Sequence, residues 1–186
     1  MKISMHTMAV DSFAPMLESL SSIFGKAVNF AEKEKLDLVN ARLAPDMYTL
    51  AQQVQQAAYY ARDGVSRLAG RPAAPMPETE TTLIGCETQI DETIRLVRAI
   101  PADDFEGAET RDCSIEISDN KIIEMDGLRF LRSWALPHFY FHIVTAYDIL
   151  RHTGMSIGKM DYLSQVGGFL CSKSHSRPNR SLNRRG

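Results

Sequence analysis

The stretch WALPHFYFHIVTAYDILR, from Trp134 to Arg151, carries the clearest structural signal in this chain. It contains no glycine, it is long enough for an α-helix, and it places His138 and His142 four residues apart among apolar and aromatic side chains. Four residues are about one helical turn, so both imidazoles project from the same face, a spacing that can hold one metal ion. The stretch therefore predicts a helix that carries a candidate two-histidine site.

We expect this helix to run from about Leu128 to His152 and to stop at Gly154. Pro137 falls inside it, ahead of both histidines. Because proline has no backbone N–H to donate, it predicts that the helix is kinked at this point or divided in two.

Two more helices are predicted in the first seventy residues. Apolar residues recur every three or four positions from Val10 to Lys35, and Pro15 falls near the start, where a missing N–H costs little. A second helix is expected from about Met47 to Leu68, with Asp46 as its N-cap and Gly70 after its end.

A proline-rich segment separates the second helix from a third. The sequence RPAAPMPETE, residues 71–80, is expected to form an extended link. The third helix is predicted from about Leu83 to Ala99, and its N-cap is expected to be one of three threonines, Thr79, Thr81 or Thr82.

The pattern changes between Gly107 and Gly127. Residues 110–117 alternate polar and apolar, residues 118–120 have turn chemistry, and residues 121–123 continue as a second short strand. The chain is therefore predicted to be all-α, a four-helix bundle with a short β-hairpin between the third and fourth helices.

Size and charge bound the classes of function. The 186 residues, 44% of them hydrophobic, fit one domain, which we place at residues 1–170. The net charge is -2, and residues 172–186 contain five basic residues and no acid, so the rest of the chain has a charge of -2 minus 5, or -7. An acidic body does not favour nucleic acid, and residues 171–186 form a basic tail that we expect to be disordered.

Cysteine use and hydropathy suggest the compartment. Three cysteines lie far apart in the sequence, which argues against a disulfide framework and favours a reducing cytoplasm. The chain has no apolar run near the roughly 20 residues that cross a bilayer, and its N-terminus does not resemble an export signal. We therefore expect a cytoplasmic protein with no membrane partner.

The residues alone leave two interpretations of the histidines open. A metal site needs a third ligand besides His138 and His142, and His6 is the remaining histidine whose position allows it. Alternatively, His138 donates to a carbonyl freed by the nearby proline, and His142 forms a hydrogen bond across the bundle to Gln53 or Gln56. In that case both histidines are structural.

Several stretches in order resemble the DUF1993 family of the DinB/YfiT-like metalloenzyme superfamily. They are RLAPDMYTLAQQVQQAAYYARDGVSRLAG at residues 42–70, ETETT at residues 78–82 and ALPHFYFHIVTAYDILRHTGMSIGKMDYL at residues 135–163. The resemblance implies an antiparallel bundle with DinB-like up-down-down-up topology, and a homodimer.

The resemblance also implies a candidate site. Members of the wider superfamily bind a divalent metal, typically zinc or nickel, through one histidine of the second helix and an HxxxH pair of the fourth. His138 and His142 match the pair, and Gln53 stands at the second-helix position. Relatives that are enzymes transfer thiols or isomerise thiol-linked substrates, but the resemblance does not imply that activity for a chain without the second-helix histidine. The first function that we consider is therefore a degenerate metal-dependent enzyme of this superfamily, with its substrate open.

Two non-catalytic functions are alternatives to that enzyme. The bundle can hold a small apolar or thiol-bearing ligand in a pocket lined by Gln53, Gln56, Tyr60, His142 and Tyr147. It can also be a purely structural dimer in which the first and fourth helices form an apolar seam.

Overall fold

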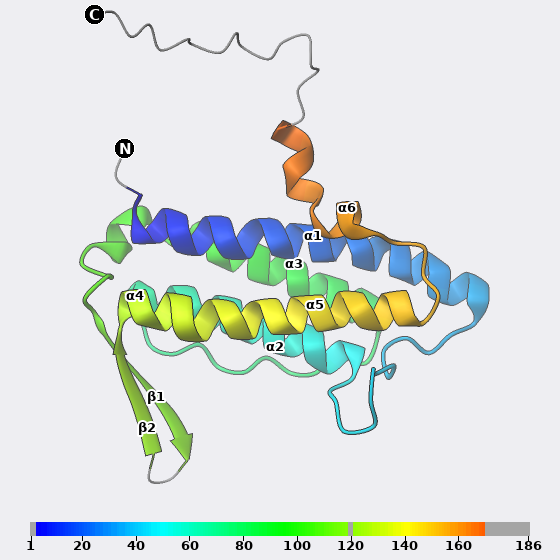
Figure 1. Cartoon of the computed structure of the whole chain (residues 1–186), viewed down its shortest axis with the longest axis horizontal. Coiled ribbons are helices and arrows are strands. Elements are labelled where there is room, and N and C mark those ends of the chain that lie inside the picture. Colours follow the sequence, from blue (N-terminus) through cyan, green and yellow to red (C-terminus); the bar gives the residue numbers. More distant parts are fainter. Residues whose placement is uncertain (1–2, 119–120, 170–186) are drawn as a thin grey trace, which may run out of the picture.

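Four long helices form the body of the computed structural model, which describes residues 3–118 and 121–169: α1 (Met5–Glu34), α2 (Leu50–Leu68), α3 (Leu83–Ala99) and α5 (Leu136–His152). Contacts join α1 to α3, α3 to α2, α2 to α5 and α5 to α1, so the helices form a closed ring of neighbours. Figure 1 shows that α1 and α5 run in one direction, that α2 and α3 run in the other, and that the link between α2 and α3 returns along the bundle. The four-helix bundle and its up-down-down-up topology are therefore as predicted.

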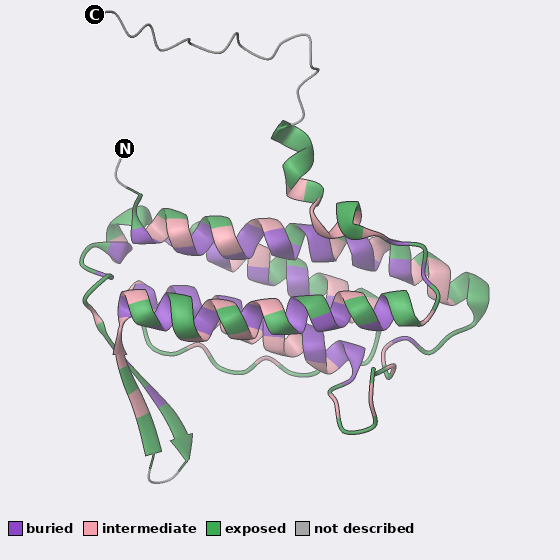
Figure 2. Ribbon diagram, viewed as in Figure 1, coloured by how far each residue is buried: buried purple, intermediate pink, exposed green. Residues whose placement is uncertain are grey.

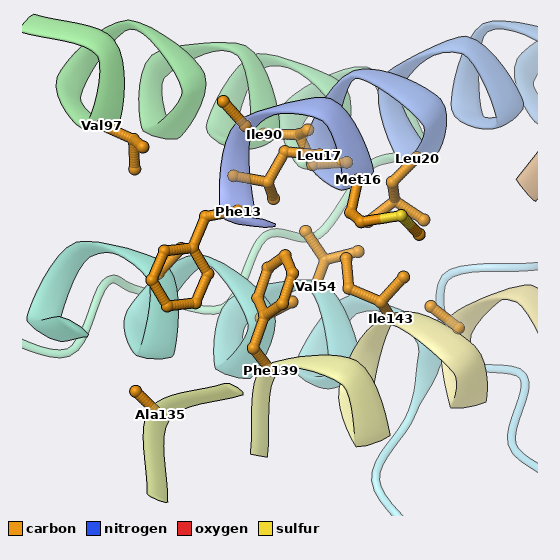
Figure 3. Close-up of a cluster of buried hydrophobic side chains, with 14 of the residues drawn as sticks. Phe13, Met16, Leu17, Leu20, Val54, Ile90, Val97, Ala135, Phe139 and Ile143 are labelled. Atoms are coloured by element: carbon orange, nitrogen blue, oxygen red, sulfur yellow. The ribbon is translucent and has the colours of Figure 1, made fainter. Parts of the chain in front are cut away.

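Aromatic and aliphatic side chains fill the space between these helices (Figure 3). The rings of Phe13 on α1 and Phe139 on α5 meet edge to face, with centroids 4.9 Å apart and an interplanar angle of 89°. Gly64 on α2 makes room for the Phe13 ring, since a Cβ built there would lie 3.0 Å from Cζ of Phe13. The core centre therefore joins three of the four helices.

Helix α1 begins at Met5, five residues earlier than the predicted start at Val10. The Ser4 hydroxyl accepts the backbone N–H of Thr7 at 3.1 Å and so supplies an N-cap. As a result Pro15 lies inside α1 and not near its first turn.

Helix α2 begins at Leu50, so the predicted start at Met47 with Asp46 as its cap is wrong. Thr49 is the N-cap: its hydroxyl accepts the N–H of Gln52, and the Gln52 side chain accepts the N–H of Thr49. This reciprocal pair satisfies two backbone donors at once, which moves the start of the helix to Leu50.

Helix α3 has the predicted bounds, and Thr82 is its cap among the three candidate threonines, accepting the N–H of Gly85 at 2.9 Å. The predicted hairpin is also present, as antiparallel strands β1 (Asp112–Ser118) and β2 (Lys121–Asp126). It projects from one end of the bundle (Figure 1). The middle of its predicted turn, residues 119–120, lies outside the described residues.

The fourth helix is continuous, so of the two outcomes expected at Pro137 the division does not occur. Helix α4 (Gly127–Arg129) leads into a π-helical segment, Phe130–Ala135, which leads into α5. The N–H of Leu136 donates to the carbonyl of Leu131, five residues back. This wider turn comes directly before Pro137, and it shifts the hydrogen-bond register at the position that has no N–H to give.

Residues after α5 fold back onto α1. They contain two short helical elements, α6 (Lys159–Tyr162) and a 3₁₀ segment, Ser164–Phe169. The hydroxyls of Ser19 and Ser164 lie 2.7 Å apart and join this segment to α1. The basic segment 171–186 lies outside the described residues.

Among the described residues, no helix combines the length and apolar character needed to cross a membrane.

The core predicts a sharp contrast between two phenylalanines of one helix. Phe139→Ala removes a fully buried ring and is expected to lower the free energy of unfolding by about 3–5 kcal/mol. Phe141→Ala, two residues along and 55% exposed, is expected to change it by less than about 1 kcal/mol. Urea unfolding of dilute protein measures both, and equal losses would contradict the described orientation of α5.

A groove lined by two histidines

His138 and His142 of α5 face α2 and stack on the same side chain, Tyr60. The His138 ring lies 4.5 Å from the Tyr60 ring at an interplanar angle of 14°, and the His142 ring lies 5.7 Å from it at 10°. Trp134 also packs against His138, with the two ring centroids 4.5 Å apart. The four-residue spacing has therefore placed both imidazoles on one face, as predicted, and an aromatic side chain of α2 holds them.

His142 is hydrogen-bonded across the bundle to Gln53, one of the two glutamines expected for this contact. Nδ1 of His142 lies 2.7 Å from Oε1 of Gln53. The Gln53 amide nitrogen donates to the carbonyl of Tyr48 at 3.4 Å, and a carbonyl can only accept, so the amide oxygen must face His142. Nδ1 of His142 therefore carries the proton, and Nε2 keeps an unprotonated lone pair.

Burial keeps both imidazoles neutral. Burial, together with a smaller contribution from the neighbouring His138, lowers the pKa of His142 to about 4. Burial also lowers the pKa of His138 below its ordinary value. At neutral pH the pair therefore presents uncharged rings, with the acceptor nitrogen of His142 fixed by Gln53.

The two histidines open onto a groove of about 510 Å³ on the α2–α5 side of the bundle. None of its lining side chains is an aspartate, glutamate, lysine or arginine. The lining consists of Tyr48, Gln56, Tyr60, Ser133, Pro137, His138, Phe141 and His142.

The structure brings most of the predicted site residues together. Gln56 and Tyr60 line the groove, whereas Gln53 lies behind His142 and is almost completely buried. Tyr147 is separate: it lines a smaller depression with Tyr162 of α6, whose ring is 5.9 Å away. Five residues beyond His142 on a helix is about 140° around the axis, which turns Tyr147 away from the groove.

His6, the candidate third ligand, is held at one end of the bundle. Its Nε2 lies 3.3 Å from the carbonyl oxygen of Ile100, and its ring meets the edge of Phe105 at 5.2 Å. In residues 3–118 and 121–169, no three histidine, cysteine, aspartate or glutamate side chains come together as a metal-binding group. His138 has no hydrogen bond to a carbonyl within these residues, so the alternative expected for it is replaced by stacking.

Two aromatic side chains of the groove, Tyr48 and Phe141, are not among the residues predicted to line the pocket. Phe141 follows His138 by three residues, so helical spacing alone was enough to place it beside the histidines. Tyr48 precedes α2, and its place beside His142, at 6.4 Å between rings, depends on the start of that helix. Because the helix was predicted to begin at Met47, Tyr48 was placed inside it and was not assigned to the pocket.

The fold and this groove define a DinB-like helical bundle with a histidine pair on its fourth helix. The family model for "Domain of unknown function (DUF1993)" matches residues 5–163, and the chain belongs to this family. The chain is also similar to a crystal structure of a DinB family member protein from Shewanella denitrificans, with 39% sequence identity and a TM-score of 0.77 over 85% of this chain and 90% of that one. Curated proteins give no significant match.

The lowered pKa of His142 predicts a pH-dependent stability. The pKa of His142 is about 4 in the folded chain and returns to the ordinary 6.5 on unfolding. As the pH falls below 6.5, His142 is therefore protonated in the unfolded chain before it is protonated in the folded chain. The stability that depends on a neutral His142 is fully present above about pH 7 and is lost as the pH falls toward 4. Between pH 7 and 5 the free energy of unfolding of the wild type should fall by about 2 kcal/mol more than that of His142→Gln.

Urea unfolding at the two pH values measures this difference. His152→Gln, at the exposed end of α5, is the matched control and should keep the wild-type dependence. A wild type and His142→Gln with the same pH dependence would show that His142 is not buried as a neutral imidazole.

Proposed function

We propose that this protein binds a small, flat and uncharged molecule in the histidine groove, and that the molecule donates a hydrogen bond to Nε2 of His142. The observation that carries the proposal is the 2.7 Å contact between His142 and Gln53, which leaves one unprotonated nitrogen on the ring that lines the groove. A fixed acceptor in a mainly aromatic groove is typical of a ligand site.

The chemistry of the groove supports this class of ligand. Its lining has no side chain that would pair with a charged group, and transfer of an unpaired charge out of water is costly. Tyr48, Tyr60 and Phe141 offer aromatic surface, which favours a flat molecule. The molecule supplies the donor, because His142 can only accept at Nε2.

The same geometry supports binding more than proton transfer. A general base works best when its pKa lies near the working pH, and the pKa of His142 is about 4. Such an imidazole accepts a hydrogen bond at neutral pH, but it removes protons poorly from a thiol or from water. We therefore propose a binding protein in preference to a thiol-activating enzyme.

Two probe molecules test the hydrogen bond directly. Indole is flat and has one N–H donor, and 1-methylindole has the same shape without the donor. We expect indole to bind the wild type roughly fivefold to tenfold more tightly, because one net hydrogen bond contributes about 1 kcal/mol. Titration followed by NMR shifts of the His142 ring measures both affinities.

His142→Phe keeps an aromatic ring and removes the acceptor, so it should bind both probes with equal affinity. Tyr147→Phe, in the separate depression, is the control and should keep the wild-type preference. Equal binding of the two probes to the wild type, or no binding of either, would contradict the proposal.

A divalent metal ion is the second candidate occupant. The supporting observation is that Gln53 accepts from Nδ1 of His142, since metal-bound histidines commonly use their second nitrogen in this way. His138 and His142 would be the protein ligands, with zinc or nickel as the ion. The Gln53 oxygen is already engaged by His142, so Gln53 acts as a support for the ring and not as a ligand.

Metal binding has its own test. Untagged protein analysed by mass spectrometry should hold about one zinc or nickel ion per chain, and added metal should raise the melting temperature. His138→Ala should abolish both effects, and His6→Ala should leave them unchanged. Metal-free protein that shows no melting shift would remove this candidate.

The state of the cysteines supports a reducing compartment. Cys86 and Cys113 are both buried as free thiols, and burial raises the pKa of Cys86 to about 12. Inert free thiols are typical of proteins of the cytoplasm, which we propose as the location.

A further inference from the structure

A pocket separate from the histidine groove lies where the end of α2 meets the base of the hairpin. Its volume is about 370 Å³, and arginines from three segments of the chain line it. Arg67 belongs to the last turn of α2, Arg71 to the link after it, and Arg111 directly precedes β1. The pocket opens to solvent beside the hairpin, most of which is exposed (Figure 2). We call it the arginine pocket.

Two of the three guanidinium groups are held in place by carboxylates. Nε of Arg67 donates to the almost completely buried Asp63 at 2.7 Å, and Nη1 donates to the carbonyl of Ser114 on β1 at 2.6 Å. Arg71 donates from Nε and Nη2 to one carboxylate oxygen of Asp104, at 3.2 and 2.6 Å. These contacts fix the positions of both side chains at the pocket.

The third guanidinium group has no carboxylate partner. Arg111 donates only to carbonyl oxygens, those of Leu68, Asp104 and Glu106, and among the described residues it forms no ion pair. Gly70, with a φ of 67°, leaves space for this side chain, since a Cβ there would lie 3.3 Å from Cζ of Arg111. The structure thus holds a half-buried positive charge at the pocket without a balancing carboxylate.

Each arginine of the pocket keeps one nitrogen free. Nη2 of Arg67, Nη1 of Arg71 and Nε of Arg111 have no hydrogen-bond partner in the part of the chain that the structure describes. Guanidinium groups that are already positioned lose little freedom when they bind an anion. Free donors with positive charge, brought to one pocket from three segments, are suited to an oxyanion.

The negative end of α2 also lies here, but its carbonyl groups are engaged. The carbonyls of residues 65–68 accept hydrogen bonds from the backbone N–H groups of residues 69–71 and from the Arg111 side chain. Donors therefore already match the partial negative charge at this helix end.

The thiol of Cys113 shows which charges dominate at the pocket wall. Burial, the largest effect, raises its pKa, whereas the positive charges of Arg67 and Arg111 lower it. Both arginines act on this pKa more strongly than the carboxylates of Asp63 and Asp112, which raise it. The balance of neighbouring charges at this wall therefore favours a negative group.

We propose that the arginine pocket binds a phosphate group, either as the free ion or as the ester of a small molecule. Guanidinium groups pair readily with phosphate oxygens, and a phosphate carries about two negative charges at neutral pH, one more than a carboxylate. The volume leaves room for a small organic group. The pocket shares no residue with the histidine groove, so this proposal does not depend on the ligand proposed there.

NMR titration of the full chain tests the site with two probes, inorganic phosphate and methyl phosphate, at an ionic strength kept constant with sodium chloride. The Nε–H signal of Arg111 and the backbone N–H signal of Ser114 should shift and saturate, with a dissociation constant on the order of a millimolar or tighter. Tighter binding of methyl phosphate would support the proposal with an ester as the ligand, and tighter binding of inorganic phosphate would support it with the free ion. The absence of a saturable shift with both probes would overturn it.

An arginine substitution with a matched control locates the anion. Arg71→Gln should weaken phosphate binding by roughly tenfold, because it removes a charge-assisted hydrogen bond. Arg98→Gln should keep the wild-type affinity: Arg98 is 49% exposed and paired with Glu18, as Arg71 is 47% exposed and paired with Asp104, but Arg98 lies outside the pocket. Equal weakening by the two variants would show a general attraction of anions and would overturn the site.

An aspartate substitution should change the affinity in the opposite direction. Asp112 is the one carboxylate in the lining, so Asp112→Asn should tighten phosphate binding by roughly threefold. Asp11→Asn removes an exposed carboxylate on α1 and should leave the affinity unchanged. Phosphate bound no more tightly by Asp112→Asn than by the wild type would place the anion outside the arginine pocket.

Discussion

The hydrogen bond between His142 and Gln53 is the constraint on which the groove depends. It joins α2 to α5 at a point where both side chains are almost completely removed from water, and a buried polar group left without its partner costs about 1–3 kcal/mol. The Tyr48 carbonyl fixes the Gln53 amide, which in turn fixes the proton of the imidazole. A structural contact of the bundle thus determines the chemistry at the groove.

The packing around this bond explains why the groove is neutral and aromatic. Tyr60 stacks on both histidines, and burial keeps both imidazoles uncharged at neutral pH. A proton, a metal ion and a donor group on a ligand would all compete for Nε2 of His142. The absence of charged side chains from the lining makes a neutral donor the occupant that costs least in desolvation.

Much of the fold follows from local patterns in the sequence. The bounds of α3 were predictable because the proline-rich link isolates this helix, whereas the sequence left its cap open among three threonines. The start of α2 was not, because the reciprocal Thr49–Gln52 pair outcompeted a plausible aspartate cap. The π-helical turn before Pro137 depends on packing of the whole helix, so the proline predicted a kink or a division but not this wider turn.

At the groove, helical spacing was enough to predict the histidine pair, but it did not predict which side chains contact the two histidines. Spacing along α5 separates Tyr147 from His142, whereas the role of Gln53 as a support depends on which face α2 turns toward α5. The measurement that tests this account most directly is the tautomer of His142, read from ¹⁵N NMR of the imidazole at neutral pH. The account predicts a proton on Nδ1 and an unprotonated Nε2, and a ring that is protonated on Nε2 or charged would contradict it.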